Sequence, residues 1–550
     1  MPSVTDVLQM AIHHLGKGEY DQARSICQRV LEVYPDQADA WHILGTIAST
    51  EGNFLEAQTL VKNAIHFHPN EPSFYQKLAT IQTSLLLYHD AIETLTALQD
   101  IDPSLSNISA DIDYLKALID YNKTAAGDFG IELEQLEKIF KYRLKQNPTD
   151  VNNLAYLAGV FEARGELEKS WEYCNLGQSI DPHNVEISIV SAKILRRQKE
   201  PALAISLLNS CLDKSLTDKQ SCDIYEQLGK CYDLTDNFGQ AFKCFEKLNL
   251  LLKNQLPAIA KNQQAYIDLV DKIKLTLTHE WFESWKENYS TECSSGPIFL
   301  LGFPRSGTTL LGQILEAHPK ILILEETSCL TSIVDKLIAA PEGYPTSLVA
   351  LSKNTTRELQ DAYMESTRVW QKLHPEKEVI IDKMPLSTID IAAIYRLFPK
   401  AKIIFAIRHP LDVCLSCLTT RFSLNGSMAN FLDLNDTAHL YQQTMDIWQS
   451  AVDNLPIDYL PVHYEKLVNN LPDESARIFS FLNLGDDHIE IDPIKLAELS
   501  KPMRTASYDQ VSQPIYLRSA YRWKNYEEQL SPIKNILAPY IKKFGYELKS

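Results

Sequence analysis

The residues best suited to chemistry lie in one stretch near the middle of the chain, Pro297-Ile-Phe-Leu-Leu-Gly-Phe-Pro-Arg-Ser-Gly-Thr-Thr309. It brings together glycines, hydroxyl side chains and one cation, Arg305, which are groups that bind phosphate or sulfate. Gly302 and Gly307 have the spacing of the nucleotide P-loop, but Thr308 stands where that loop has lysine. The stretch therefore predicts a site that suits a short anion such as a 5′-phosphosulfate better than the β- and γ-phosphates of ATP.

A strand and a helix must position this loop. The apolar run Ile298–Leu301 reads as a buried strand, and apolar residues at helical spacing follow from Leu310 to Leu315, stopping before Pro319. Such a strand–loop–helix unit aims backbone N–H groups and a helix dipole at an anion. An ordinary strand–turn–helix junction is the alternative, but the run Pro-Arg-Ser-Gly-Thr-Thr has little packing reason to exist.

A short apolar segment and a further predicted strand are each followed by charged residues. Ile321–Leu324 is followed by Glu325 and Glu326, and Val379–Ile381 is followed closely by Lys383. Ligands of open α/β sheets bind at the carboxyl ends of strands. A carboxylate there can deprotonate an acceptor hydroxyl, and a fixed cation can stabilise the charge that develops on a leaving group. Surface charges, or helix-capping acids, are the alternative interpretation.

Ile403–Ile407 gives the strongest strand signal, with Arg408 at its carboxyl end and Ser416 eight residues later in a predicted helix. An arginine fork and a hydroxyl together suit a phosphate dianion. Asp458–His463 is a candidate last strand, and Tyr464 follows it. Tyr464 is interpreted either as a ligand-binding residue or as part of the core.

Three neighbouring motifs resemble the 5′-phosphosulfate loop and its surroundings in sulfotransferases that use 3′-phosphoadenosine 5′-phosphosulfate (PAPS). They are Pro304-Arg-Ser-Gly-Thr-Thr-Leu310, Ala317-His-Pro319 and Glu325-Glu-Thr327. The form is similar to that of protein-tyrosine sulfotransferases and their bacterial relatives with helical repeats. A second match, Ser507-Tyr-Asp-Gln-Val-Ser-Gln-Pro-Ile-Tyr516, resembles the family's loop over the adenosine and phosphates, with Arg522 where lysine is usual.

The resemblance assigns roles residue by residue. The implied catalytic residues are Glu326 as base, Lys383 on the bridging oxygen and Ser507 beside the sulfonate. The implied cofactor-binding residues are Arg305, Ser306, Gly307, Thr308, Thr309, Arg408, Ser416, Tyr464, Gln510, Val511, Pro514 and Arg522. One family arginine, four residues after the serine, falls here on Thr420, with Arg421 next to it.

The N-terminal half repeats itself with a period of 34 residues, seen from Pro35 to Pro69 and from Pro69 to Pro103. Other positions keep the same step, namely Gly18 and Gly52, Tyr20, Phe54 and Tyr88, and Ala23, Ala57 and Ala91. This is the signature of tetratricopeptide (TPR) repeats, in which small residues let two helices pack closely. About seven repeats are predicted, one with an insertion around 122–130.

Bulk properties narrow the function. A length of 550 residues predicts several domains, namely a repeat array at 1–250, a helical linker at 251–295 and an α/β domain at 296–550. The net charge of −18 argues against nucleic acid as the main partner. Ten scattered cysteines, no signal peptide and no membrane span predict a cytoplasmic protein. The sequence shows no cluster of histidine and cysteine ligands, so it does not imply a metal.

The sequence therefore predicts an all-α TPR superhelix followed by a P-loop-like α/β sulfotransferase domain with a mostly parallel sheet. The predicted reaction moves a sulfuryl group from PAPS, without a metal, to an acceptor hydroxyl. The acceptor is a tyrosine of a peptide or protein recruited by the repeats, or a carbohydrate or lipid. The repeats either bind that segment or only support or dimerise the catalytic half. A non-catalytic TPR adaptor with a nucleotide-binding domain, and a kinase-like enzyme, are the rival hypotheses.

Overall fold

The computed structural model describes residues 3–85, 87–105, 107–125, 133–254, 257–285, 296–485 and 519–548. The described residues form two compact units, one ending at residue 180 and one beginning at residue 181. No helix in these ranges combines the length and the apolar character that a bilayer crossing requires. The predicted boundaries after residues 250 and 295 differ from this division and stay a prediction about which segments fold independently.

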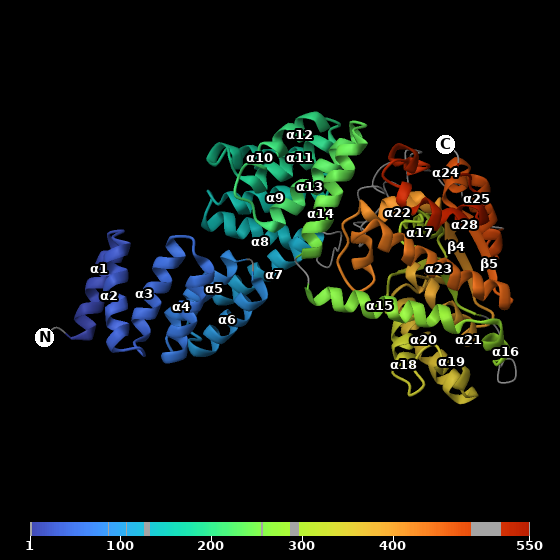
Figure 1. The fold of residues 1–550 in the computed structure, drawn as a ribbon, viewed down its shortest axis with the longest axis horizontal. Coiled ribbons are helices and arrows are strands. Elements are labelled where there is room, and N and C mark those ends of the chain that lie inside the picture. The colour runs from blue at the N-terminus through green and yellow to red at the C-terminus, as the bar shows by residue number, and fades with distance from the viewer. Residues whose placement is uncertain are drawn as a thin grey trace. The chain divides into compact units, whose positions relative to one another are not determined.

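The first unit is built entirely from helices in its described part (Figure 1). They are α1 (Val4–Gly16), α2 (Tyr20–Val33), α3 (Ala38–Thr50), α4 (Phe54–Phe67), α5 (Pro72–Ser84), α6 (Tyr88–Ile101), α7 (Ile108–Ala125), α8 (Leu133–Gln146), α9 (Val151–Ala163) and α10 (Leu167–Ile180). Most of the predicted insertion, from residue 126 on, lies outside the described residues.

Small residues at the repeat positions explain why these helices pair. Ala23, Ala57 and Ala91 are fully buried. A Cβ placed on Gly45 in α3 would lie 2.5 Å from Val61 Cγ2 in α4, so only glycine permits this approach. The aromatic residues that open two successive repeats also make equivalent bonds. Trp41 Nε1 donates to the Pro35 carbonyl and Tyr75 OH donates to the Pro69 carbonyl, both at 2.9 Å.

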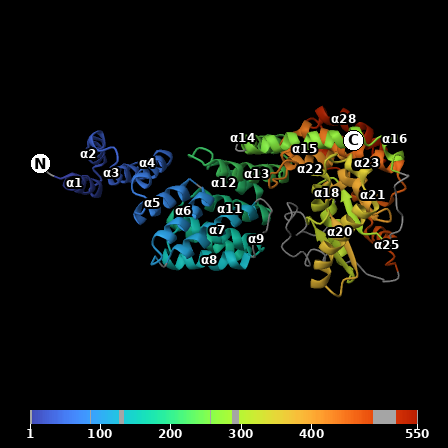
Figure 2. The same ribbon diagram turned by 90° about the horizontal axis from the view of Figure 1, so that it is seen from below.

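The second unit begins with six helices that continue the all-helical part of the chain. They are α11 (Val185–Arg197), α12 (Pro201–Asn209), α13 (Asp218–Leu234), α14 (Phe238–Asn254), α15 (Pro257–Thr276) and α16 (His279–Glu283). Side chains from α14 to α16, including Phe245, Ile273 and Phe282, belong to the same hydrophobic core as the α/β part. Figure 2 shows α15 running alongside α23 (Leu434–Asn454), which it contacts.

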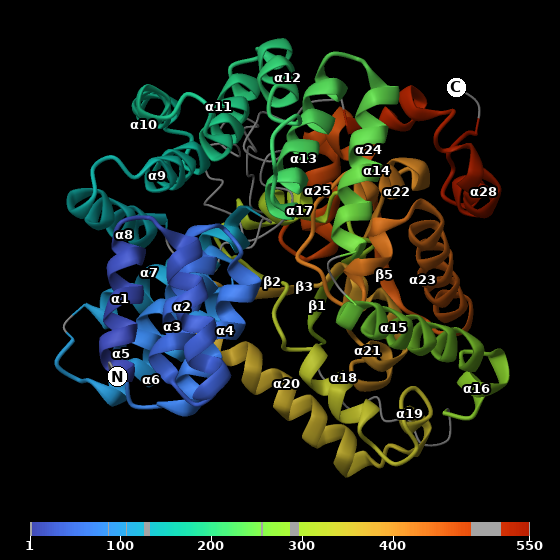
Figure 3. The same cartoon turned by 60° about the vertical axis from the view of Figure 1, so that its left-hand side comes forward.

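A five-stranded parallel sheet forms the centre of the second unit (Figure 3). Its strands are β1 (Ile298–Gly302), β2 (Ile321–Glu325), β3 (Val379–Lys383), β4 (Lys402–Ile407) and β5 (Asp458–His463). Their spatial order is β2-β3-β1-β4-β5, and every pairing is parallel. The four segments predicted as strands are strands, the short apolar segment Ile321–Leu324 forms the fifth, and the predicted fold class is confirmed.

Side chains that alternate along the strands separate two core layers. Phe299 and Phe405 enter the layer shared with the helices before the sheet, whereas Leu300 and Ile404 enter a smaller layer on the opposite face. The remaining elements are α17 (Thr308–Glu316), α18 (Thr331–Ile338), α19 (Ser347–Ala350), α20 (Lys353–Leu373), η2 (Pro385–Asp390), α21 (Ile391–Leu397), α22 (Pro410–Leu418), η3 (Met428–Leu432), α23 (Leu434–Asn454), α24 (Tyr464–Asn469), α25 (Leu471–Phe481), η5 (Arg522–Tyr526), η6 (Ser531–Ile533) and α28 (Lys534–Lys543).

Candidate active site

Parallel strands place their carboxyl ends on one edge of the sheet, and most of the predicted site residues lie on that edge. Lys383 is the last residue of β3 and pairs in register with Glu325, the last residue of β2. Arg408 directly follows β4, and Tyr464 directly follows β5. Residues distant in sequence therefore meet at the position where α/β sheets bind ligands.

The loop between β1 and α17 has a backbone that few sequences can adopt. Gly307 has a φ of 91°, and a Cβ there would lie 2.6 Å from Cδ2 of the Tyr464 ring. Glycine is therefore required for both its conformation and its lack of a side chain. Arg305 also has a positive φ, 69°, although it is not glycine. Strained residues of this kind concentrate at functional sites.

Neighbouring elements hold this loop on both sides. The Thr388 hydroxyl of η2 accepts a hydrogen bond from Gly302 N at 3.0 Å and donates to Gly302 O at 2.7 Å. The thiol of Cys417 in α22 donates a hydrogen bond to Pro304 O at 3.6 Å. The loop is thus anchored at its start before it reaches Arg305.

Three of the predicted cofactor-binding residues contact one another directly. Arg305 Nε donates to Ser416 Oγ at 3.0 Å, and Arg408 Nη1 donates to the Arg305 carbonyl at 3.0 Å. All three side chains are buried. Arg305 is therefore in one cluster with Arg408 and Ser416, each of which lies more than 100 residues away from it in the sequence.

Arg408 has further contacts outside this cluster. Its guanidinium lies 4.8 Å from the centre of the Tyr464 ring, and its Nη2 donates to Ser519 O at 2.5 Å. Its Nε is buried and has no hydrogen-bond partner among the described residues. A buried donor on a permanent cation suits a phosphate or sulfate group, so the residues present fit an anionic donor molecule.

The two adjacent acids after β2 have different environments. Glu325 Oε1 forms an ion pair with Lys383 Nζ, and Lys383 is only 1% exposed. Glu326 has a φ of 51°, and its backbone N donates to the Lys383 carbonyl at 2.9 Å. Burial raises the pKa of Glu326, while Lys383 acts to lower it and Glu325 to raise it further. A carboxyl with a raised pKa suits a general base that works near neutral pH.

Helix α17 leaves room for Lys383. A Cβ on Gly312 would lie 3.7 Å from Lys383 Cδ, so the aliphatic part of the lysine runs along the helix that follows the loop. The loop residues Ser306, Thr308 and Thr309 are buried at the start of that helix. The predicted catalytic cation therefore packs against the helix that directly follows the predicted anion loop.

Arg522, predicted to bind the cofactor, contacts helix α13. Its Nη2 and Nε donate to Asp233 Oδ1 of α13 at 2.8 and 3.2 Å. Its role toward a cofactor stays a prediction. Ser507, Gln510, Val511 and Pro514 lie outside the described residues.

Sequence reasoning missed several residues that build the site. Thr388, which anchors the loop, sits in a turn with no recognisable signal. Glu465 accepts from His409 N at 3.0 Å and from the Tyr546 hydroxyl at 2.5 Å, and so ties β4 and β5 to the C-terminal segment. The position of Glu465 directly after Tyr464 was the only available hint of its role.

Comparisons with known proteins find matches in both parts of the chain. Residues 297–488 match the model of the sulfotransferase family, and residues 8–36 match that of the tetratricopeptide repeat. An uncharacterised protein of Aquifex aeolicus (strain VF5) is 24% identical over 96% of this chain and 68% of its own length. Protein-tyrosine sulfotransferase 2 of Gallus gallus is 25% identical over 46% of this chain and 69% of its own length.

Among solved structures, a sulfotransferase domain from the curacin biosynthetic pathway is similar, with 19% identity and a TM-score of 0.34. The alignment covers 46% of this chain and 99% of that domain. The family match spans the loop, the two acids, Lys383, Arg408 and Ser416. The chain therefore combines tetratricopeptide repeats with a domain that matches the sulfotransferase family, as its sequence predicts.

Proposed function

We propose that this protein transfers a sulfuryl group from PAPS to an acceptor hydroxyl. The observation that carries the proposal is the direct contact of Arg305, Ser416 and Arg408 at the carboxyl edge of the sheet. The phosphosulfate loop and the proposed 3′-phosphate pair are thus close enough for one nucleotide to reach both. The family match over residues 297–488 supports the same reaction.

In this proposal the loop amides, Ser306, Thr308 and Thr309 bind the 5′-phosphosulfate, assisted by the dipole of α17. Arg408 and Ser416 bind the 3′-phosphate, and Tyr464 supports the Arg408 guanidinium through its ring. Ser507, Gln510, Val511, Pro514 and Arg522 are proposed to complete the donor site, as the family resemblance implies.

The reaction is an in-line substitution at sulfur. The acceptor oxygen forms a bond to sulfur while the bond from sulfur to the bridging oxygen breaks, and that electron pair stays on the 5′-phosphate. Glu326 takes the proton of the acceptor hydroxyl, and Lys383 stabilises the charge on the leaving phosphate. Because Lys383 is paired with Glu325, its ammonium group must turn toward the donor for this role.

The acceptor is a tyrosine on a peptide or protein held by the repeats, with a carbohydrate or lipid hydroxyl as the alternative. TPR arrays commonly bind peptide segments, which favours a peptide acceptor. An assay of labelled PAPS against peptide and glycan panels decides this point. Labelling of tyrosine peptides alone supports recruitment of a peptide by the repeats. Labelling of glycans alone contradicts a peptide acceptor.

Calorimetry tests the donor site. The proposal expects tight binding of 3′,5′-adenosine bisphosphate without magnesium, and weaker binding of 5′-AMP because the second phosphate is missing. Magnesium-dependent binding of ATP, together with no binding of the bisphosphate, would instead indicate a kinase-like enzyme. Binding of the bisphosphate without turnover on any acceptor would indicate a non-catalytic adaptor.

A further inference from the structure

Helix α13 carries three acidic residues that each contact an arginine from the α/β part of the same unit. Arg421 Nη1 lies 2.5 Å from Asp223 Oδ1 and 3.5 Å from Glu226 Oε2. Arg522 Nη2 lies 2.8 Å from Asp233 Oδ1, which also accepts from the Tyr526 hydroxyl at 2.6 Å. The Arg421 and Arg522 side chains are only 16% and 17% exposed. These pairs are therefore shielded from solvent, unlike surface salt bridges.

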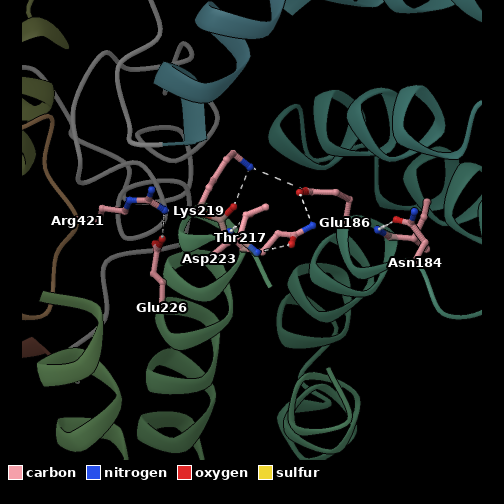
Figure 4. Close-up of polar contacts among 9 residues, drawn as sticks. Asn184, Glu186, Thr217, Lys219, Asp223, Glu226 and Arg421 are labelled. Carbon is pink, nitrogen blue, oxygen red and sulfur yellow. Dashed lines mark hydrogen bonds and ion pairs between the residues drawn. The ribbon is translucent and has the colours of Figure 1, made fainter. Parts of the chain in front are cut away.

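The Arg421 pair belongs to a larger charged network, shown in Figure 4. Lys219 Nζ donates to Asp223 Oδ2 at 3.0 Å and lies 3.9 Å from Glu186 of α11. Lys219 and Arg421 hold the pKa of Asp223 well below its ordinary range, despite the burial that would raise it. Asp223 is thus a permanent anion between a repeat lysine and an arginine of the α/β part.

Arg421 lies just beyond the end of α22, the helix that carries Ser416. The end of α22 is held by further bonds. Asn249 Nδ2 of α14 donates to Leu418 O at 3.0 Å, and Thr420 Oγ1 donates to Ser416 O at 2.6 Å. Carbonyls in the last turn of a helix lack partners within the helix, so these donors fix its end. The C-terminal end of α22 is therefore anchored to α13 and α14.

The other end of α22 is connected to α13 through Arg522. The neighbouring residue, Trp523, donates its backbone N to Asp412 Oδ1 in the first turn of α22 at 2.7 Å. Asp223 and Asp233 are ten residues apart, which corresponds to roughly 15 Å along a helix, about the length of α22. The two carboxylates are thus spaced to hold both ends of this helix.

We propose that Asp223 and Asp233 are positioning residues of the donor site: they fix α22, and α22 fixes Ser416 against Arg305 of the phosphosulfate loop. This inference rests on the proposed function only for the identity of the donor. Arg421, next to the position where the family resemblance expects an arginine, is bound to α13 in this arrangement. The last repeat helices are then part of the catalytic unit and not only a recruitment platform.

The experiment compares Asp223→Asn and Asp233→Asn with the wild-type protein. Asparagine keeps the size and the hydrogen-bonding capacity but removes the charge that holds each arginine. The matched control is Glu137→Gln, which breaks an ion pair with Arg164 in the first unit, where the side chains are 20% and 19% exposed. A thermal melt of each variant selects those that keep a cooperative transition.

The first readout is amide hydrogen exchange of residues 303–309 without any ligand. We expect faster exchange there in Asp223→Asn and in Asp233→Asn, and unchanged exchange in Glu137→Gln. Equal protection of this loop in all variants overturns the positioning role, whether or not the protein binds PAPS. This readout therefore separates the inference from the proposed function.

The second readout is calorimetric affinity for 3′,5′-adenosine bisphosphate. We expect the Kd to rise about tenfold in Asp223→Asn, in the range of measured couplings between contacting elements. The double variant Asp223→Asn/Arg421→Gln is expected to lose no more affinity than Arg421→Gln alone, because the arginine substitution already breaks the contact with Asp223. If the losses of affinity from the two substitutions add, the contact between Asp223 and Arg421 does not position the donor site. Absence of binding in the wild type contradicts the proposed function instead.

Discussion

At the scale of single residues, the two adjacent acids after β2, Glu325 and Glu326, differ in their surroundings and therefore in their proposed roles. Lys383 is almost fully buried and paired with Glu325, whereas burial raises the pKa of Glu326. Environment thus separates one acid that neutralises a cation from one that can accept a proton. Their order in the sequence alone does not separate them.

The base assignment predicts that Glu326→Ala lowers kcat about 10²–10⁴-fold, the usual contribution of a positioned general base. Affinity for 3′,5′-adenosine bisphosphate should stay within about twofold, since the role concerns the acceptor proton. In the wild type, kcat/KM should rise with pH through the raised pKa of this carboxyl. Sulfuryl-transfer assays from pH 5 to pH 9 measure both effects.

The exposed acid Glu358 of α20 provides the control, since Glu358→Ala is expected to leave turnover unchanged. Unchanged turnover in Glu326→Ala would remove Glu326 as the base.

The ion pair itself predicts a stability effect. Glu325→Gln leaves the buried ammonium of Lys383 without its counter-charge, which should cost about 3 kcal/mol, toward the low end for broken buried pairs because Glu325 is partly exposed. Chemical denaturation measures this loss. The double variant Glu325→Gln/Lys383→Met should recover most of it, and a loss that persists would mean that the pair does not account for the effect.

Asp382 precedes Lys383 in the sequence and contacts Tyr363. We expect its ionisation to make the stability of the protein depend on pH. Burial raises the pKa of Asp382 to about 7, and the Tyr363 hydroxyl donates to its Oδ2 at 3.1 Å. Between about pH 4 and pH 7, Asp382 keeps its proton in the folded protein but has lost it in the unfolded chain. The stabilisation that this proton gives the folded protein is therefore complete below about pH 4 and is lost as the pH rises to about 7.

Asp382→Asn cannot ionise, and its side-chain oxygen can still accept the Tyr363 bond. Relative to the wild type, the variant should therefore gain up to about 4 kcal/mol between pH 4 and pH 7, at ~1.36 kcal/mol for each pKa unit. Denaturant titrations at several pH values measure the difference. A difference that does not change with pH would show that Asp382 is ionised in the folded protein.

At the scale of elements, the β1–α17 loop depends on contacts from three other segments. Thr388 holds its start, Ser416 accepts from Arg305, and Tyr464 lies against Gly307. The strand, the loop and the helix were predictable from local sequence, because their signals are local. Their supports come from residues 80 to 160 positions away, which no local pattern connects.

Gly307→Ala tests this element. The positive φ costs an L-residue about 1–2 kcal/mol, and the new Cβ would displace the Tyr464 ring. We expect a lower melting temperature and at least about tenfold weaker bisphosphate binding, which corresponds to ~1.4 kcal/mol. The control is Gly239→Ala in α14, where a Cβ would meet no atom within 4 Å. Equal effects of the two substitutions would contradict the close fit at Gly307.

At the scale of the whole molecule, the chain divides at residue 180 and not where the repeats end. The helices from α13 to α16 share a hydrophobic core with the sheet, and Asn249 and Arg421 tie them to it by polar contacts. The repeat pattern continues past this boundary, since repeats are defined by packing within a hairpin. The sequence therefore predicts the repeats but not which of them belong to the catalytic unit.

This division predicts the behaviour of fragments. The fragment 181–550 should unfold cooperatively and bind 3′,5′-adenosine bisphosphate like the full chain, because it keeps the complete core of the second unit. The fragment 296–550 should expose the apolar surface that α14 to α16 cover and should aggregate. Circular dichroism melts and calorimetry compare the two. A well-folded, binding-competent 296–550 would support the boundary predicted at 295.

The sequence by itself determined the repeats, four of the five strands, the loop and helix after the first strand, and the residue types at the strand ends. These features follow from periodicity, turn chemistry and motif spacing, which are properties of adjacent residues. The tertiary structure decided the partners. Lys383 pairs with Glu325, Arg408 holds the Arg305 carbonyl, and Arg421 and Arg522 bind α13. A long cation can reach several anions, and only the packed core selects one of them by fixing distance and excluding water.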